Sequence, residues 1–320
     1  MKYAFAAALI GAVVLAAPAD AQNYPSRNIT VIIPFAPGNA NDITGRIVFE
    51  QLGKQLSQAI VIENRPGAGG TIGIGQAARA APDGYTILFH SASFSASYVT
   101  HKTLPYDTLG DFTAVSAVGI SPSVLVAAPS KGYKTAADLI AASKAKPGEL
   151  NFASAGIGAA SHLAAEKFRV AAGIKAQHVP FKGPVEALTE VMAGRIDYYF
   201  LPIAPALPLI KDGKVTALAV SSEKRAPSLP DVPTVIEIGL PGAVYAFWNG
   251  VFVPVKTPAD IVARLYAETQ KAIADASVKE RLAKLGIEPL VMSQPEFERY
   301  FKADVLDTDK LAKEAGIEKQ

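Results

Sequence analysis

Short apolar segments alternate with amphipathic segments along most of this chain, and that alternation restricts the fold more than any other feature of the sequence. Residues 29–35, 60–63 and 85–89 are rich in Ile, Val and other apolar residues, as buried strands are. Between the first two, residues 43–56 place apolar side chains on one face at helical spacing. Strands that alternate with helices in this way form parallel sheets covered by helices. The sequence therefore predicts an α/β fold.

The same pattern starts again near residue 124 and defines a second block. Its predicted strands are 124–127, 150–153, 178–181 and 196–200, separated by helices that include 136–144 and 185–192. The chain leaves this block near residues 252–254 and ends with two predicted helices, 258–276 and 294–315. About 300 residues, of which half are apolar, are enough for two cores. We expect one lobe from residues 22–123 with 252–320, and a second from residues 124–251.

The first 21 residues predict export. Lys2 supplies a positive start, residues 4–17 are almost entirely apolar, and Ala19-Asp20-Ala21 has small residues where a signal peptidase cleaves. A membrane anchor is the alternative, but a spanning helix needs about 20 apolar residues. This apolar stretch is shorter than that. We expect cleavage after Ala21 and a protein that is released into the periplasm.

Composition excludes several classes of function. The chain has no cysteine, so it has neither a disulfide nor the cysteine to which a bacterial lipid anchor is attached. A formal net charge of +2 without a basic cluster argues against nucleic acid as a partner. The histidines at 90, 101, 162 and 178 do not have metal-ligand spacing. We therefore expect no metal, cofactor or lipid anchor. We also expect a monomer.

Three junctions between a predicted strand and a predicted helix share one composition. Residues 37–42, 154–159 and 181–184 are rich in Gly, Pro and other small residues. The start of a helix presents unpaired backbone N–H groups and the positive end of the helix dipole, both of which favour an anion. Ligands of open α/β sheets lie beyond the carboxyl ends of the strands, so the three junctions could converge on one carboxylate. The alternative is that they are ordinary turns that need glycine for geometry alone.

Signatures of catalysis are weak. Residues 67–73 contain the glycines of a dinucleotide loop at the wrong spacing and lack the acidic residue that would follow about 20 positions later. Ser161 and His162 are adjacent on a predicted helix and point to different sides. These observations predict that the protein is not an enzyme. A periplasmic hydrolase or isomerase remains the alternative.

A series of motifs gives the chain a family likeness. They include YPSR at 24–27, IPFAPG at 33–38, ENRPGAGG at 63–70, AAPDGYT at 80–86, NFAS at 151–154, PFKG at 180–183 and LPDVPT at 229–234. In these motifs and their order, the whole mature chain resembles the Bug family, the TctC-like receptors of tripartite tricarboxylate transporters.

The resemblance implies a type II-like Venus flytrap of two α/β lobes that are joined by two crossing strands. It also implies that the loops of both lobes hold the carboxylate of the ligand. The positions that match the family's binding residues are Phe35, Gly38, Asn39, Asp42, Ser154, Ala155, Gly156, Gly158, Ala159, Phe181, Lys182, Gly183 and Asp197. Ser91 and Ser93 follow the third predicted strand and could supply hydroxyls to the far end of the ligand, or they could form a structural turn.

The function implied by the resemblance is capture of a small organic carboxylate for the membrane subunits of such a transporter. A sensory role, in which the loaded receptor docks on a signalling protein, is a further alternative.

The sequence departs from the family pattern in the predicted site. Asn39 stands where the family usually has Gly. Ala155, Ala159 and Phe181 stand at three positions where the family usually has a hydroxyl-bearing residue. Loss of these hydroxyls leaves a ligand with several charges short of partners, and an unpaired buried polar group costs about 1–3 kcal/mol. We expect a carboxylate with an aromatic or otherwise apolar body to suit the pocket better than citrate. The alternative is that water or backbone groups replace the lost hydroxyls.

Overall fold

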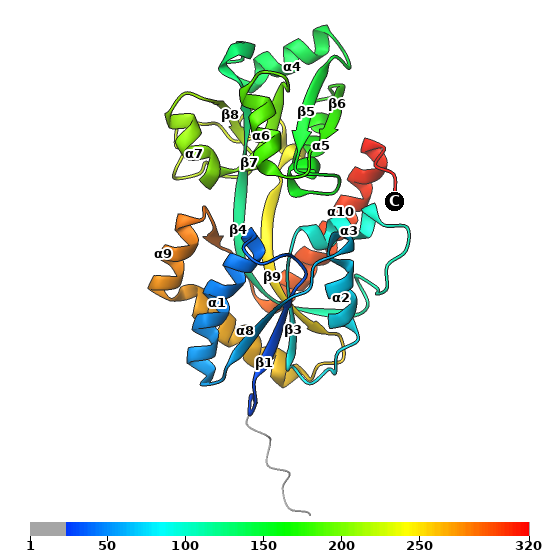
Figure 1. Cartoon of the computed structure of the whole chain (residues 1–320), viewed down its shortest axis with the longest axis vertical. Helices are drawn as coiled ribbons and strands as arrows, with labels where there is room; N and C mark the ends of the chain where they lie inside the picture. Colours follow the sequence, from blue (N-terminus) through cyan, green and yellow to red (C-terminus); the bar gives the residue numbers. More distant parts are fainter. Residues whose placement is uncertain (1–23, 320) are drawn as a thin grey trace, which may run out of the picture.

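The computed structural model describes residues 24–319, and the predicted signal peptide at residues 1–21 lies outside this range. Figure 1 shows two lobes of helices and strands, with β4 (Phe112–Ala127) and β9 (Ala246–Pro254) running from one lobe to the other. This is the two-lobed α/β architecture that the sequence predicts. Every helix within the described range is too short or too polar to cross a membrane.

The first lobe is built around three parallel strands that continue into the crossing strands. The strands are β1 (Ile29–Ile33), β2 (Ile60–Asn64) and β3 (Thr86–Ser91), and the short β10 (Glu288–Pro289) pairs with β4. The helices are α1 (Ala40–Leu56), η1 (Ala68–Gly70), α2 (Thr71–Ala78), α3 (Ser93–Thr100), α8 (Ala259–Ala274), α9 (Ala276–Lys284) and α10 (Gln294–Ala315). Helices α8 and α9 therefore return to the lobe in which the described chain begins, and α10 runs from this lobe to the second one, where Leu311 joins a buried cluster (Figure 1).

The second lobe has its own strands and helices. The strands are β5 (Leu150–Ser154), β6 (Ala176–Pro180), β7 (Tyr198–Pro202) and β8 (Thr216–Val220). The helices are η2 (Pro129–Lys131), α4 (Ala136–Ala145), α5 (Ala160–Ala171), α6 (Pro184–Met192), α7 (Ile203–Lys211) and η3 (Pro241–Ala243). Across the molecule the strand order is β2-β1-β3-β9-β4-β7-β5-β6.

Strand β4 belongs to both lobes. Its residues 112–122 pair with β9, and its residues 123–127 pair with β7 and β8. The sequence predicted only residues 124–127 of this strand, because Ser, Gly and Pro interrupt the apolar pattern before Ser123. The division of the chain at 123/124 and 251/252 stays a prediction, since both positions lie within continuous strands.

Other differences from the predicted elements have local causes. Helix α8 matches the predicted helix 258–276 closely, but α9 was not predicted. The Asp275 side chain accepts the N–H groups of Ser277 and Val278 and so starts α9. Helix α7 was not predicted, and its Pro208 lies inside the helix. Such a proline disfavours a helix unless tertiary contacts stabilise it.

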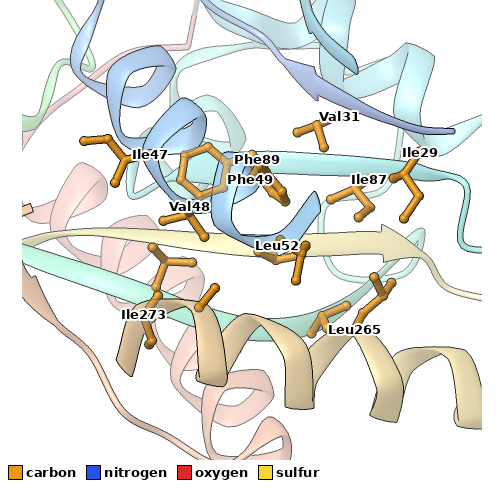
Figure 2. Close-up of a cluster of buried hydrophobic side chains, with 14 of the residues drawn as sticks. Ile29, Val31, Ile47, Val48, Phe49, Leu52, Ile87, Phe89, Leu265 and Ile273 are labelled. Carbon is orange, nitrogen blue, oxygen red and sulfur yellow. The ribbon is translucent and has the colours of Figure 1, made fainter. Parts of the chain in front are cut away.

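The core of the first lobe occupies both faces of its sheet. Val31 and Ile33 belong to one buried cluster, and Ile32 belongs to another. Neighbouring strand residues point to opposite faces, so a strand that is covered on both sides is apolar at every position. Figure 2 shows the first cluster, in which side chains of β1, β3, α1 and α8 meet. This packing fixes the direction in which α1 leaves the sheet.

Gly250 of β9 lets the C-terminal helix pack against the crossing strands. A Cβ atom at this position would overlap the ring of Phe297 on α10, and Phe297 is fully buried. No other residue type fits without moving that ring. Gly250 therefore fixes how closely α10 approaches β9.

Gly250→Ala should lower the free energy of unfolding by about 1–3 kcal/mol, as other overpacked cores do. Urea denaturation of the purified protein measures this change. Gly242→Ala is a matched control, because its Cβ would meet the nearest atom at an ordinary 3.5 Å. Adding Phe297→Leu should restore part of the loss. Equal stability of the Gly250→Ala variant and the wild type would contradict this account of α10.

Candidate functional site

A cavity of about 600 Å³ lies between the two lobes. The crossing strands contribute Ser121 and Ser123 from β4, and Phe247 and Asn249 from β9. The first lobe adds the start of α1 and the end of α9, and the second lobe adds the starts of α5 and α6 and the junction of β7 with α7. A molecule held in this cavity would therefore contact both lobes and the strands that join them.

Three helices begin at the cavity. Ala40 of α1, Ala160 of α5 and Pro184 of α6 all line it, and each is the first residue of its helix. These are the helices that follow the three glycine-rich junctions of the sequence. The positive ends of three helix dipoles therefore face one space.

Backbone N–H groups at these helix starts have no protein partner within residues 24–319. They belong to Ala40 and Asn41 at α1, Ala160 and Ser161 at α5, and Gly183 and Val185 at α6. The first turn of any helix leaves such donors free unless a cap, water or ligand accepts from them. Six donors from three helices can together surround a carboxylate or a similar anion.

Asp42 holds the loop that leads into α1. Its carboxylate accepts hydrogen bonds from the N–H of Gly38 at 2.8 Å, from Asn64 Nδ2 at 2.9 Å and from Arg46 Nε at 3.0 Å. Burial opposes the charge, but the hydrogen bonds from Arg46, Gly38 and Asn64 together outweigh it and hold the pKa of Asp42 below its usual value. The carboxylate thus accepts its hydrogen bonds from donors of the protein, and these bonds stabilise the loop.

A series of hydrogen bonds between buried polar side chains connects the crossing strands at the cavity to the first lobe. Asn249 Nδ2 of β9 donates to Asn41 Oδ1, and Asn41 Nδ2 donates to Ser91 Oγ at 3.1 Å. All three residues are buried. Buried amides of this kind are kept in place by their partners, so the start of α1 is fixed relative to the crossing strands.

The remaining walls of the cavity are largely apolar. They include Ile43, Val185, Leu188, Phe247, Leu285 and Ile287. Val185 is 78% exposed and Ile43 is 38% exposed, so large apolar side chains from both lobes face open space. Lys284 is the one charged side chain among the described residues that line the cavity. The site therefore combines backbone donors at the helix starts with apolar surface around them.

A family model described as the tripartite tricarboxylate transporter family receptor matches residues 44–317. This chain belongs to that family. The predicted resemblance is thus confirmed.

Relatives and solved structures agree with this assignment. The receptor is 36% identical to BugT of Bordetella pertussis over 292 residues, which is 91% of this chain and 89% of BugT. It superimposes with a TM-score of 0.79 on R. palustris Rpa4515 solved with adipate, at 31% identity and with coverage of 93% of this chain and 100% of that one. MatC of Rhodopseudomonas palustris, solved with bound malate, gives a TM-score of 0.74 at 32% identity, with coverage of 90% and 99%.

Members of the family are periplasmic solute receptors, and this chain is a solute-binding protein. The prediction that it is not an enzyme is confirmed, and the alternative of a hydrolase or isomerase is wrong.

Three of the residues predicted to bind the ligand lie next to the cavity lining of the receptor. Asn39, Ala159 and Gly183 each directly precede the first helical residue that lines the cavity. None of the predicted residues is itself part of the lining. Their contact with a ligand stays a prediction, and the structure places the first turns of the three helices nearer to the space.

Several of the residues predicted to bind the ligand contact other protein groups through hydrogen bonds or ring packing. Ser91 accepts from Asn41 at 3.1 Å and from the N–H of Ser93 at 3.4 Å, so it joins the series of hydrogen bonds described above. Phe35 packs edge-to-face on His90, with ring centroids 5.2 Å apart. The N–H of Lys182 donates to Glu186 Oε2 at 3.3 Å. These contacts between protein groups give the loops a defined shape.

Asp197 is separated from the other predicted residues, and its place argues against contact with a ligand. It precedes β7 and accepts the N–H of Asn151 at the start of β5 at 2.8 Å, while Lys131 Nζ lies 2.7 Å from its other oxygen. Because β5 and β7 are parallel, this is the amino end of the strands. The cavity lies at their carboxyl end, where Pro202 lines it.

Sequence reasoning did not identify Asn41 and Asn249 as site residues. Asn249 lies between Trp248 and Gly250 in an otherwise apolar strand and is 1% exposed. A lone amide inside an apolar strand was the available signal, since a buried polar group needs a partner. The partner came from a residue 208 positions away in the sequence.

Asn39 should cap α1, because its side-chain oxygen accepts the N–H of Asp42 at 2.9 Å. Asn39→Ala should lower the free energy of unfolding by about 1 kcal/mol, and Asn39→Gly by only a few tenths. Urea denaturation distinguishes the two variants. Thr135→Ala removes the corresponding cap of α4 in the second lobe and serves as the control. Indistinguishable stability of Asn39→Ala and the wild type would refute the cap.

Proposed function

We propose that this receptor captures a small organic carboxylate with an aromatic or otherwise apolar body in the periplasm and delivers it to the membrane subunits of a tripartite tricarboxylate transporter. The observation that supports this proposal is the cavity at which three helices begin, with unpaired N–H groups from both lobes beside apolar walls. The anionic end of the ligand would lie at the helix starts. Its body would lie against the apolar residues.

The number of available donors is sufficient for useful affinity without an arginine. A hydrogen bond to a charged group contributes about 1.5–3 kcal/mol, and a helix terminus about 0.3–1 kcal/mol more. Three or four such contributions reach the roughly 8 kcal/mol of a micromolar complex. Because the donors come from α1 in one lobe and α5 and α6 in the other, binding would favour closure of the lobes around the ligand.

The apolar walls favour a ligand with an apolar body. Burial of apolar surface contributes about 25 cal/mol per Å², and Ile43 and Val185 offer such surface from opposite lobes. The loops also lack the hydroxyl groups expected at positions 155, 159 and 181. Similar receptors were solved with adipate and with malate, so the family includes ligands with both apolar and polar bodies. Here the lining favours the former.

Export through the predicted signal peptide would place the mature protein where this capture occurs. Cleavage after Ala21 leaves a chain without cysteine, which excludes attachment by a lipidated cysteine. The released receptor would then diffuse between ligand and transporter.

A thermal-shift screen tests the class of ligand. Benzoate and phenylacetate should raise the melting temperature by several degrees at concentrations about 100 times their Kd, because bound ligand adds about 2.7 kcal/mol of stability there. Citrate and malate should have smaller effects at the same concentrations. Strong stabilisation by citrate or malate with inert aromatic acids would contradict the apolar-body proposal. Failure of every acid tested would contradict carboxylate binding.

Proline at the first helical position removes a single N–H group from the site and leaves the helix intact. Ala40→Pro and Ala160→Pro should each weaken binding of the best acid from the screen about tenfold or more, the loss of one hydrogen bond to a charged group. Asn39 and Ala159 are both extended, as a residue before proline must be. Isothermal titration calorimetry measures the change.

Ala276→Pro is the matched control for these variants. It starts α9 after the extended Asp275 and does not line the cavity. It should leave both affinity and fold unchanged. Unaltered affinity in Ala40→Pro and Ala160→Pro would show that the helix starts do not hold the carboxylate.

A further inference from the structure

Two stacked histidines lie behind the loop that leads into α5. The rings of His162 on α5 and His178 on β6 have centroids 3.9 Å apart and planes inclined by 12°. Phe152 of β5 stacks on His178 at 4.9 Å. His162 is buried and His178 is half-buried. The two histidines are separated along the chain and have no metal-ligand spacing, so we did not expect them to be in contact.

Each imidazole contacts a different part of the loop. His162 Nδ1 accepts the N–H of Gly158 at 3.2 Å. His178 Nε2 lies 2.6 Å from Ser154 Oγ, and this hydroxyl accepts the N–H of Gly156 at 3.1 Å. The two rings together therefore restrain both glycines of the loop.

The loop needs restraint, because glycine has more backbone freedom than any other residue. Gly156 has φ +127° and Gly158 has φ +75°, both in the region that favours glycine. The loop ends at Ala160 and Ser161, whose unpaired N–H groups belong to the site. A change at either glycine would move these donors relative to α1 and α6.

We propose that His162 and His178 are positioning residues for ligand capture, which hold residues 154–158 so that the start of α5 faces the cavity in the geometry that a carboxylate requires. The role rests on the proposed function of the cavity. The histidines would act through the loop and not by contact with the ligand, since neither lines the cavity.

The surroundings keep both rings neutral at neutral pH. Burial, with smaller effects of His178 and Arg169, lowers the pKa of His162 to about 3, and burial lowers the pKa of His178 to about 4. Glu166 Oε1 is 3.8 Å from His162 Nε2, but Glu166 is also paired with Arg169 at 2.6 Å. The other charged groups that line the hollow beside the rings are Lys102, Glu318 and Lys319.

Acid would release the loop. A protonated Nδ1 carries a hydrogen and cannot accept the N–H of Gly158, and two charged rings at this separation would repel. The unfolded chain takes up these protons below its ordinary pKa of about 6.5, whereas the folded protein does so only near pH 3 to 4. Stability should therefore fall as the pH drops below about 6.5, because the unfolded state binds more protons there. Release of the Gly158 N–H itself should follow only near pH 3, where His162 takes up a proton.

Amide hydrogen exchange without ligand tests the role of the rings directly. In His162→Phe, which retains an aromatic ring but lacks the acceptor, the Gly158 amide should exchange about tenfold faster, the loss expected for one hydrogen bond. His162→Asn should restore most of the protection, because its side-chain oxygen can take the place of Nδ1. Phe152→Leu is the matched control: it weakens the stack without removing a hydrogen bond from the loop, so Gly158 should stay protected.

Affinity for benzoate, measured by calorimetry well below the melting temperature, should follow the same order. His162→Phe should bind about tenfold more weakly, while His162→Asn and Phe152→Leu should stay close to the wild type. Wild-type affinity should be constant from about pH 8 to about pH 5, where both rings stay neutral and benzoate stays ionised.

The exchange measurement separates the two proposals. Equal protection of Gly158 in His162→Phe and the wild type would overturn the positioning role, whatever binds in the cavity. An equal loss of affinity in Phe152→Leu and His162→Phe would overturn it too, because the stack alone would then account for the effect. If the wild type bound no carboxylate although Gly158 responded as expected, the proposed function would fail while the restraint of the loop by the histidines would stand.

Discussion

Backbone N–H groups at the start of a helix need acceptors, and this receptor leaves those of α1, α5 and α6 without a protein partner in the described part of the chain. The loops before these helices are shaped by hydrogen bonds that leave these donors free. Asp42 holds the loop before α1, and the two stacked histidines contact the loop before α5. Stability of the loops and availability of the donors therefore come from different atoms.

The crossing strands turn three separate helix starts into one site. Strand β4 pairs with β9 in its first part and with β7 and β8 in its last part, so it belongs to the sheets of both lobes. Each lobe has a buried cluster of its own, and a further cluster of the second lobe also takes in Ala96 of α3 and Leu311 of α10. Gly250 lets α10 pack closely on β9 in the first lobe. Lobes with their own cores can move as units about two strands. A ligand that accepts from both lobes would then select the closed arrangement.

The cavity lining offers a ligand both polar groups and apolar surface. The helix starts supply direction and charge, while Ile43 and Val185 supply apolar surface that is exposed in this arrangement of the lobes. The series of hydrogen bonds from Asn249 through Asn41 to Ser91 fixes the crossing strands relative to α1. Under the proposed function, recognition of a carboxylate would rest on the backbone, whereas the choice among carboxylates would fall to a few side chains that can change without disturbing the fold.

Much of this architecture can be predicted from the sequence, because strand and helix periodicity are local properties. The α/β class, the two blocks and the three junctions were all visible in the spacing of apolar residues, glycine and proline. The length of β4 and the presence of α9 were not visible in this spacing, since pairing with distant strands and the cap at Asp275 decided them. Most of the residues predicted to bind the ligand belong to the loops before the helices, while the structure places the first turns of those helices in the cavity lining. The family resemblance implied Asp197 as a site residue, but Asp197 lies at the end of its strand that is opposite the cavity. Local pattern determined which segments fold and where donors are left over. Only tertiary structure decided which donors meet, because the contacts of Asn41 with Asn249 and of His162 with His178 join residues that are far apart in the sequence.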